Sequence, residues 1–224
     1  MTSKLKILAL ALAATFALGA VAASPASAIY ELHSGSGSGT TYLTAVQTVT
    51  AQLDTEKGNI KCTTVTGKGS FTGTTDLVST IEDPTFSGCT AFGVTAHIDM
   101  MGCDFLIEGS GISSGVVHIE CPTTAGGVTH EITITPTQGG VPICHIDLGE
   151  QTGVFSITNE KLPSPDDIVN SLTTKTLTYR VTPVGENTKC GSAGLRHDGA
   201  LTNPVTVRAY SDVTHTNQVN LTFQ

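Results

Sequence analysis

Apolar and polar residues alternate along most of the chain with a period of two. This period is typical of strands with one buried face, because successive side chains point to opposite sides of a sheet. Thr and Val are frequent at the alternating positions, and both favour strands. We therefore expect strands over residues 42–53, 60–66, 69–73, 77–81, 85–89, 94–101, 128–135, 143–148, 154–158, 173–183, 200–210 and 213–223.

The stretch 102–122 predicts a β-hairpin whose register can be read from the sequence. If the two arms pair about a tip at 110–114, a disulfide closes the open end and apolar pairs share one face. These pairs are Cys103 with Cys121, Phe105 with Ile119, and Ile107 with Val117. The other face is mainly charged, with Asp104 opposite Glu120, and we expect it to meet water.

Glycine and proline separate the expected strands at short intervals, for example at 57–59, 67–69 and 83–84. Such connections are turns, which favour antiparallel pairing over helical crossovers. The only segment with helix signals is 164–172, where Ser164 can cap a short turn and Pro165 suits its first position. The pattern predicts an all-β fold, a disulfide-bonded antiparallel β-sandwich of jelly-roll or Greek-key type in preference to a barrel.

The first 28 residues have the pattern of an export signal, in a form typical of bacteria. Two lysines precede an apolar run at 7–21, and Ala26-Ser27-Ala28 provides a cleavage site. The run is too short for a membrane span, so we expect no membrane insertion once the signal is removed. The expected mature chain has a flexible Gly/Ser segment at 29–39 and one β-sandwich domain at 40–224, and is secreted or held at the cell surface.

Charge excludes two classes of partner. Removal of the signal takes away 2 of the 11 basic residues and none of the 19 acidic ones, so the net charge falls from −8 to −10. A chain this acidic, with scattered Lys and Arg, has no positive surface for nucleic acid or for an anionic membrane.

Six cysteines in an exported chain predict three disulfides. The hairpin register pairs Cys103 with Cys121. Neighbours in sequence then suggest the remaining two pairs, Cys62 with Cys89 and Cys144 with Cys190, among the fifteen pairings that six cysteines allow. No two cysteines are spaced as in a Cys-x-x-Cys metal site.

A His-Ile-acid pattern recurs three times in expected strands. Its outward-facing members are His97 with Asp99, His118 with Glu120, and His145 with Asp147. One interpretation is a patch that binds a divalent cation or another ligand. The other, which we favour, is the polar face of half-exposed strands, and on that basis we assign no metal site.

Other catalytic signals are weak. Residues 111–115 match the G-x-S-x-G pattern of serine hydrolases, but they occupy a hairpin tip with no helix after it. The Arg196-His197-Asp198 motif could hold a triad-like pair, although a His beside an Asp is common in loops. No phosphate-cradling loop or other cofactor motif is present. We expect neither a cofactor nor a catalytic residue.

The sequence therefore favours an exported, non-catalytic protein that acts by binding or assembly at the cell surface or in the extracellular matrix, with a protein or polysaccharide as partner. The alternative is a carbohydrate- or small-ligand-binding module that uses some of the tyrosines Tyr30, Tyr42, Tyr179 and Tyr210. A secreted hydrolase is the least favoured. Self-association through the uncharged segment 218–224 is a further hypothesis, which competes with burial of that segment in a sheet.

Overall fold

The computed structural model describes residues 30–37, 39–47, 49–160, 167–169, 176–202 and 205–224. The expected export signal lies outside these residues. Within these ranges every regular element is a strand, so the prediction of an all-β fold is confirmed. The same ranges contain no helix long and apolar enough to cross a membrane.

The strands fall into three groups according to their pairing. We call the first group the upper half: β2 (Thr40–Gln47), β5 (Thr64–Thr72), β7 (Val78–Ser87), β10 (Asp104–Gly111), β11 (Ser114–Glu120), β15 (Gln151–Glu160), β16 (Asp167–Val169) and β19 (Val205–Tyr210), with β20 (Gln218–Val219) appended. The lower half consists of β3 (Ala51–Thr55), β4 (Gly58–Cys62), β8 (Thr90–Ala91), β9 (Val94–Asp99), β12 (Ile132–Gln138), β14 (Cys144–Leu148), β17 (Leu177–Pro183) and β18 (Gly194–Thr202), with β13 (Val141–Pro142) appended. A small sheet contains β1 (Leu32–Ser34), β6 (Thr75–Asp76) and β21 (Leu221–Phe223).

Each half closes on itself. In the upper half the strands follow one another in sequence order, and β16 pairs with β19 while β19 pairs with β2. In the lower half the order is again that of the sequence, closed by β18 with β3 and by β9 with β12. All of these pairings are antiparallel, so each half is a closed up-and-down arrangement.

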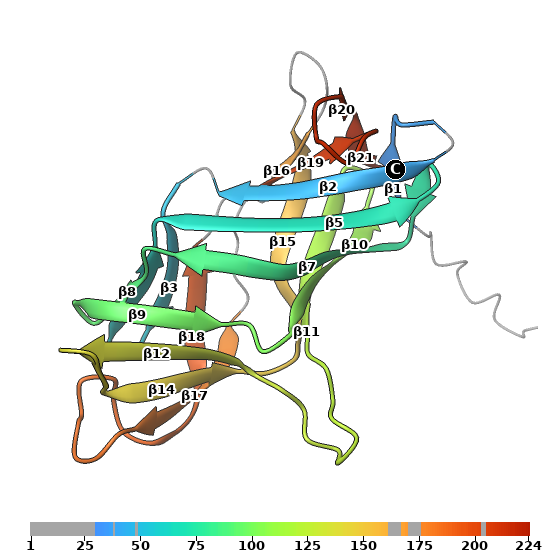
Figure 1. Ribbon diagram of the computed structural model, residues 1–224. Coiled ribbons are helices and arrows are strands. Elements are labelled where there is room, and N and C mark those ends of the chain that lie inside the picture. Colours follow the sequence, from blue (N-terminus) through green and yellow to red (C-terminus); the bar gives the residue numbers. More distant parts are fainter. Residues whose placement is uncertain (1–29, 38, 48, 161–166, 170–175, 203–204) are drawn as a thin grey trace, which may run out of the picture.

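The chain passes repeatedly between the two halves, and neighbours in one half are neighbours in the other. For example, β9 continues into β10 and β12 follows β11, while β10 pairs with β11 and β9 pairs with β12 (Figure 1). Among the described residues, each of the eight main strands of the upper half has a sequence neighbour in the lower half; we call each of these pairs a long strand and the level between the two halves the waist. The expected sandwich with jelly-roll or Greek-key order is wrong, because sequential pairing continues around the molecule until the first and last long strands meet.

Two of the three disulfides lie at the waist. Cys62 joins Cys89 where β4 leads into β5 and β7 leads into β8, and Cys103 joins Cys121 at the open end of the β10–β11 hairpin. The third joins Cys144, at the start of β14, to Cys190 in the β17–β18 connection. These are the three pairs expected from the sequence, and such bonds fit an oxidising environment.

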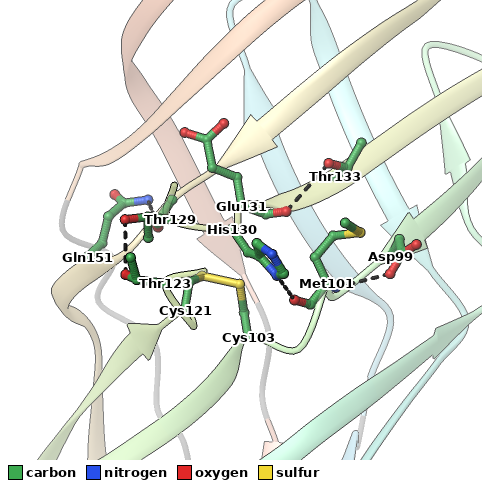
Figure 2. Close-up of a disulfide and its surroundings, with 11 residues drawn as sticks. Asp99, Met101, Cys103, Cys121, Thr123, Thr129, His130, Glu131, Thr133 and Gln151 are labelled. Carbon is green, nitrogen blue, oxygen red and sulfur yellow. Dashed lines mark hydrogen bonds between the residues drawn. A yellow bond between two sulfur atoms is a disulfide. The ribbon is translucent and has the colours of Figure 1, made fainter. Parts of the chain in front are cut away.

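Figure 2 shows the waist around the Cys103–Cys121 disulfide. The chain turns sharply from β9 into β10, with Met101 and Gly102 both at positive φ (52° and 77°). The turn is fixed by hydrogen bonds, since the Met101 N–H donates to Oδ1 of Asp99 (3.0 Å) and the Met101 carbonyl lies 2.8 Å from Nδ1 of His130. Through His130, the β11–β12 connection is thereby hydrogen-bonded to the β9–β10 connection.

The β10–β11 hairpin has the register that the sequence predicts, with Phe105 opposite Ile119, Ile107 opposite Val117 and Asp104 opposite Glu120. Its apolar face points into the molecule, where Ile107, Val117 and Ile119 are buried. This face belongs to a core that runs through both halves and is supplied mainly by aliphatic side chains.

Two expected turns are in fact parts of strands. Residues 67–69 lie within β5, where a Cβ on Gly67 would come 2.3 Å from Cγ2 of Ile81 and a Cβ on Gly69 would come 1.9 Å from the Thr80 carbonyl oxygen. These glycines therefore allow β7 to approach closely. Pro84 lies within β7 at an irregularity in the β5–β7 register, where the missing N–H is tolerated.

Two further expectations need correction. The segment 29–39 is not uniformly loop-like, because Leu32–Ser34 forms β1 between β6 and β21, with Leu32 and Ser34 buried. Residues 167–169, expected in a helical turn, form β16 between β15 and β19. Pairing on both sides outweighs the local helix signals, and the rest of 164–172 lies outside the described residues.

The C-terminal strand β21 is buried, with side chains of Leu221 and Phe223 at 0% and 1% exposure. One of its edges pairs with β1. On its other side, the Asn159 side-chain amide accepts a hydrogen bond from the Phe223 N–H (2.9 Å) and donates one to the Phe223 carbonyl (3.2 Å). The alternative in which this segment is part of a sheet fits the burial of Leu221 and Phe223, and self-association through 218–224 stays a hypothesis.

Loss of the Cys103–Cys121 disulfide should destabilise the protein. A Cys103→Ala/Cys121→Ala variant is expected to lose about 3 kcal/mol of unfolding free energy, because the bond closes a loop of 18 residues in the unfolded chain. Urea unfolding measures the change. Peptide mapping of the non-reduced wild type is the control, and a peptide joining Cys103 to any other cysteine would contradict the register.

Removal of the Phe223 ring should lower the stability of the core and leave the oligomeric state unchanged. Phe223→Ala is expected to lose about 3–5 kcal/mol, the usual effect of deleting a buried Phe side chain. Gln224→Ala, at an exposed neighbour, should be nearly neutral. Urea unfolding and light scattering are the measurements. A wild type that dimerises and a Phe223→Ala variant that is monomeric but equally stable would restore the self-association hypothesis.

Candidate functional site

The six residues of the His-Ile-acid pattern lie in two separate regions. His97 and Asp99 are on β9 and His145 and Asp147 are on β14, both in the lower half. Strand β12 runs between β9 and β14 and places Thr135 opposite His97, with its hydroxyl 3.2 Å from Nδ1 of His145. Threonine thus separates the two histidines along this face.

His118 and Glu120 lie on β11 in the upper half. Nδ1 of His118 accepts a hydrogen bond from the Gly153 N–H (3.0 Å), so the neutral ring carries its proton on Nε2. Nε2 is 3.0 Å from Oε2 of Glu108, although the contact is out of line for a hydrogen bond. No group of three or more His, Cys, Asp or Glu among the described residues is arranged to hold a metal ion.

The motif at 196–198 contacts a buried tyrosine. Tyr179 is 2% exposed, its hydroxyl donates to Oδ1 of Asp198 (3.0 Å), and it accepts a hydrogen bond from the Glu56 N–H (3.2 Å). His197 instead contacts a threonine hydroxyl through Nδ1. Burial raises the pKa of the Tyr179 hydroxyl above its ordinary value of 10.0, and the Asp198 carboxylate raises it further. The triad-like pair that this motif could have held is therefore not formed, because Asp198 and His197 have other partners.

The G-x-S-x-G match at 111–115 is the tip of the β10–β11 hairpin, as the sequence predicts. Ser113 is exposed and has φ of 69°, a left-handed turn conformation. No helix follows it within the hairpin, so the strand-to-helix elbow that activates such a serine is not formed.

The structure does bring together two of the four tyrosines considered as ligand-binding residues. Tyr42 on β2 lies directly opposite Tyr210 on β19, and both side chains are half-buried on the outer face. The imidazole of His215 packs edge-on against both, with ring centroids 5.1 Å from Tyr210 and 6.3 Å from Tyr42. We call these three residues the aromatic cluster.

A tight turn after β19 places His215 in the cluster. The Asp212 carboxylate accepts hydrogen bonds from the N–H groups of Thr214 (3.0 Å), Thr216 (3.2 Å) and Asn217 (2.7 Å), and from both threonine hydroxyls. The Thr214 hydroxyl contributes most to holding the pKa of Asp212 well below its usual range. His215 takes a left-handed φ of 55° and keeps Nε2 buried without a hydrogen-bond partner.

A shallow hollow of about 390 Å³ lies on the same outer face, across β2, β5 and β7. Its lining includes Thr44, Thr66, Lys68, Glu82 and Thr85. The hollow coincides with the register irregularity at Pro84. Thr66 pairs with Thr85 and the next pair is Lys68 with Glu82, so β7 contains one residue more than β5 between these two pairs. Such a bulge locally bends the strand.

The aromatic cluster and the hollow lie side by side on one surface, along two adjacent rows of side chains that run across the strands. The first row crosses four strands as Gln218, Tyr210, Tyr42 and Ser70, and the next as Arg208, Thr44, Lys68 and Glu82. The sequence indicates Tyr42 and Tyr210 as candidates but not His215. The local signal for His215 is Asp212 with threonines two and four residues later, a pattern typical of Asx turns.

No known protein family, curated protein or solved structure matches this chain. The outer surface described above is therefore the basis for a functional proposal.

Tyr179 should make stability sensitive to alkaline pH. Above pH 10.0 the unfolded chain loses the hydroxyl proton while the folded protein keeps it, so stability should fall as the pH rises toward the raised pKa of the folded state. Tyr179→Phe should lose about 1 kcal/mol at neutral pH, because the Glu56 N–H loses its partner, and should show a shallower alkaline decline.

Urea unfolding on either side of pH 10.0 measures both effects, with Tyr210→Phe as the matched control that should keep the wild-type slope. Equal alkaline slopes for Tyr179→Phe and the wild type would contradict the assignment.

Proposed function

We propose that this chain is an exported, non-catalytic binding protein whose ligand is a polysaccharide of the cell envelope or extracellular matrix. The binding surface comprises the aromatic cluster and the adjoining hollow. The observation that carries the proposal is the position of Tyr42 and Tyr210, side by side on an outer sheet face and next to a row of polar side chains.

The chemistry of this surface suits a sugar ring. A pyranose presents C–H groups on its faces and hydroxyls around its rim, so it needs an aromatic surface beside hydrogen-bonding groups. The aromatic cluster supplies the aromatic surface. Thr44, Lys68 and Glu82 supply hydrogen-bond donors and acceptors, with one positive and one negative group among them. The volume of the hollow, about 390 Å³, is in the range of small-molecule sites.

Features elsewhere favour surface recognition over the other two functions. Assembly by strand addition requires a free edge, whereas the eight main strands of each half close into a ring and β21 is flanked by β1 and Asn159. Among the described residues the open edges belong to β6, β13 and β20, which have two residues each. Hydrolysis requires an activated nucleophile, whereas Ser113 lies at an exposed tip and Asp198 contacts Tyr179. Binding through an outer face remains compatible with the closed sheet.

The proposal predicts that the mature chain binds polysaccharides and that the aromatic pair is required. Tyr42→Ala and Tyr210→Ala should each weaken binding about tenfold, equivalent to about 1.4 kcal/mol, because each removes a surface on which a sugar ring stacks. Affinity electrophoresis in gels containing cell-wall or matrix polysaccharides, supported by a glycan array, provides the measurement.

Tyr30→Ala is the matched control, since Tyr30 lies beside Gly109, away from the cluster, and should keep wild-type binding. Circular dichroism verifies that each variant is folded. Absence of binding to every polysaccharide, or equal binding by all three variants, would overturn the proposal.

A further inference from the structure

Five apolar side chains point into the closed sheet and yet are only partly buried: Phe86, Ile98, Phe105, Leu201 and Val205. Their inward direction follows from the alternation along each strand; Val205, for instance, shares a face with the buried Val207 and Ala209. All five line apolar cavities in the interior. The interior is therefore incompletely filled.

Two cavities account for this unfilled space. One, of about 50 Å³, lies in the upper half and is lined by residues that include Ala45, Val65, Ile81 and Ile107. The other, of about 60 Å³, extends from the waist into the lower half, with a lining that includes Leu53, Ile60, Ile98 and Ile132. Phe105 lines both cavities, so its side chain lies between them.

The composition of the chain explains why space remains. An eight-stranded closed sheet has an interior just wide enough for side chains to fill or for one small ligand. This interior contains no Trp, and small residues, Ala45, Gly67 and Ala51, occupy inward positions around the cavities. The linings of both cavities are mostly apolar, so water finds few hydrogen-bond partners in them.

The arrangement of the cavities selects the shape of a ligand. One cavity is lined by strands of the upper half, the other extends into the lower half, and Phe105 lines both, so together they extend along the direction of the long strands. A compact ring fits neither cavity, since each is well below the roughly 150 Å³ at which an apolar cavity holds benzene. A linear molecule matches the shape.

We propose that the interior is a second binding site, for the short unbranched alkyl chain of an apolar or amphiphilic molecule. The chain lies along the interior of the closed sheet, and the Phe105 ring turns aside so that the two cavities become one. Apolar burial drives binding. The site is separate from the outer surface proposed for polysaccharide, and neither proposal depends on the other.

Methyl-detected NMR of the mature protein tests the proposal with 1-hexanol as the probe. Saturable shifts are expected for lining methyl groups in both cavities, such as those of Ile107 and Ile132. The methyl groups of Ile112, which is 79% exposed at the hairpin tip, should not move. Hexane-1,6-diol, of the same length but polar at both ends, should bind at least tenfold more weakly.

Two substitutions should change the affinity in opposite directions. Phe105→Ala joins the cavities permanently and should tighten 1-hexanol binding about tenfold, and Phe105→Leu should act in the same direction if the alanine variant does not fold. Ala45→Val narrows the upper cavity and should weaken binding. Absence of saturable shifts in both the wild type and a folded Phe105 variant, or equal shifts with the diol, would overturn the proposal.

Discussion

Closure of the strand pairing is the constraint on which the rest of this structure depends. Because the first and last long strands pair through β2 with β19 and β3 with β18, each of the eight long strands has a neighbour on both sides in both halves. Backbone groups that an open sheet would expose at its edges are thereby hydrogen-bonded. At the waist, where pairing passes from one half to the other, two disulfides join neighbouring strands.

The same closure determines where recognition can take place. A polysaccharide is too large for the interior, and in the described part of the chain strand addition finds open edges only at short strands such as β6, β13 and β20, so outward side chains and connections remain for such a partner. The aromatic cluster lies at the seam where closure occurs, since Tyr42 belongs to the first long strand and Tyr210 to the last. The site proposed for polysaccharide thus exists only in the closed form of the sheet.

Close approach between strands accounts for several residues that break the alternating pattern. Gly67 and Gly69 leave room for Ile81 and Thr80 on β7, and Pro84 marks the irregularity that shapes the hollow. In the interior, small inward residues leave the two cavities on either side of Phe105. The outer hollow thus coincides with an irregularity in strand pairing, and the inner space with small side chains in a closed interior.

The sequence by itself determined the features that depend on local geometry. The two-residue period predicts strands, and in the hairpin it also fixes the register, because a slip by one residue would turn Phe105 and Ile107 outward. The three disulfides join cysteines that are neighbours in sequence, so they too were within reach of local argument. Tyr42 and Tyr210 were identified as candidates, although nothing local indicated that they meet.

Only the tertiary structure decided closure, the aromatic cluster and the strand at 167–169. The backbone hydrogen bonds that join β19 to β2 are the same for almost any pair of strands, so side-chain pattern does not reveal which distant strands will pair. Gly67 and Pro84 show the same limit, because the residue types that terminate a strand locally also permit close packing or a bulge within one. The choice between these roles depends on the neighbouring strand, which the chain acquires only on folding.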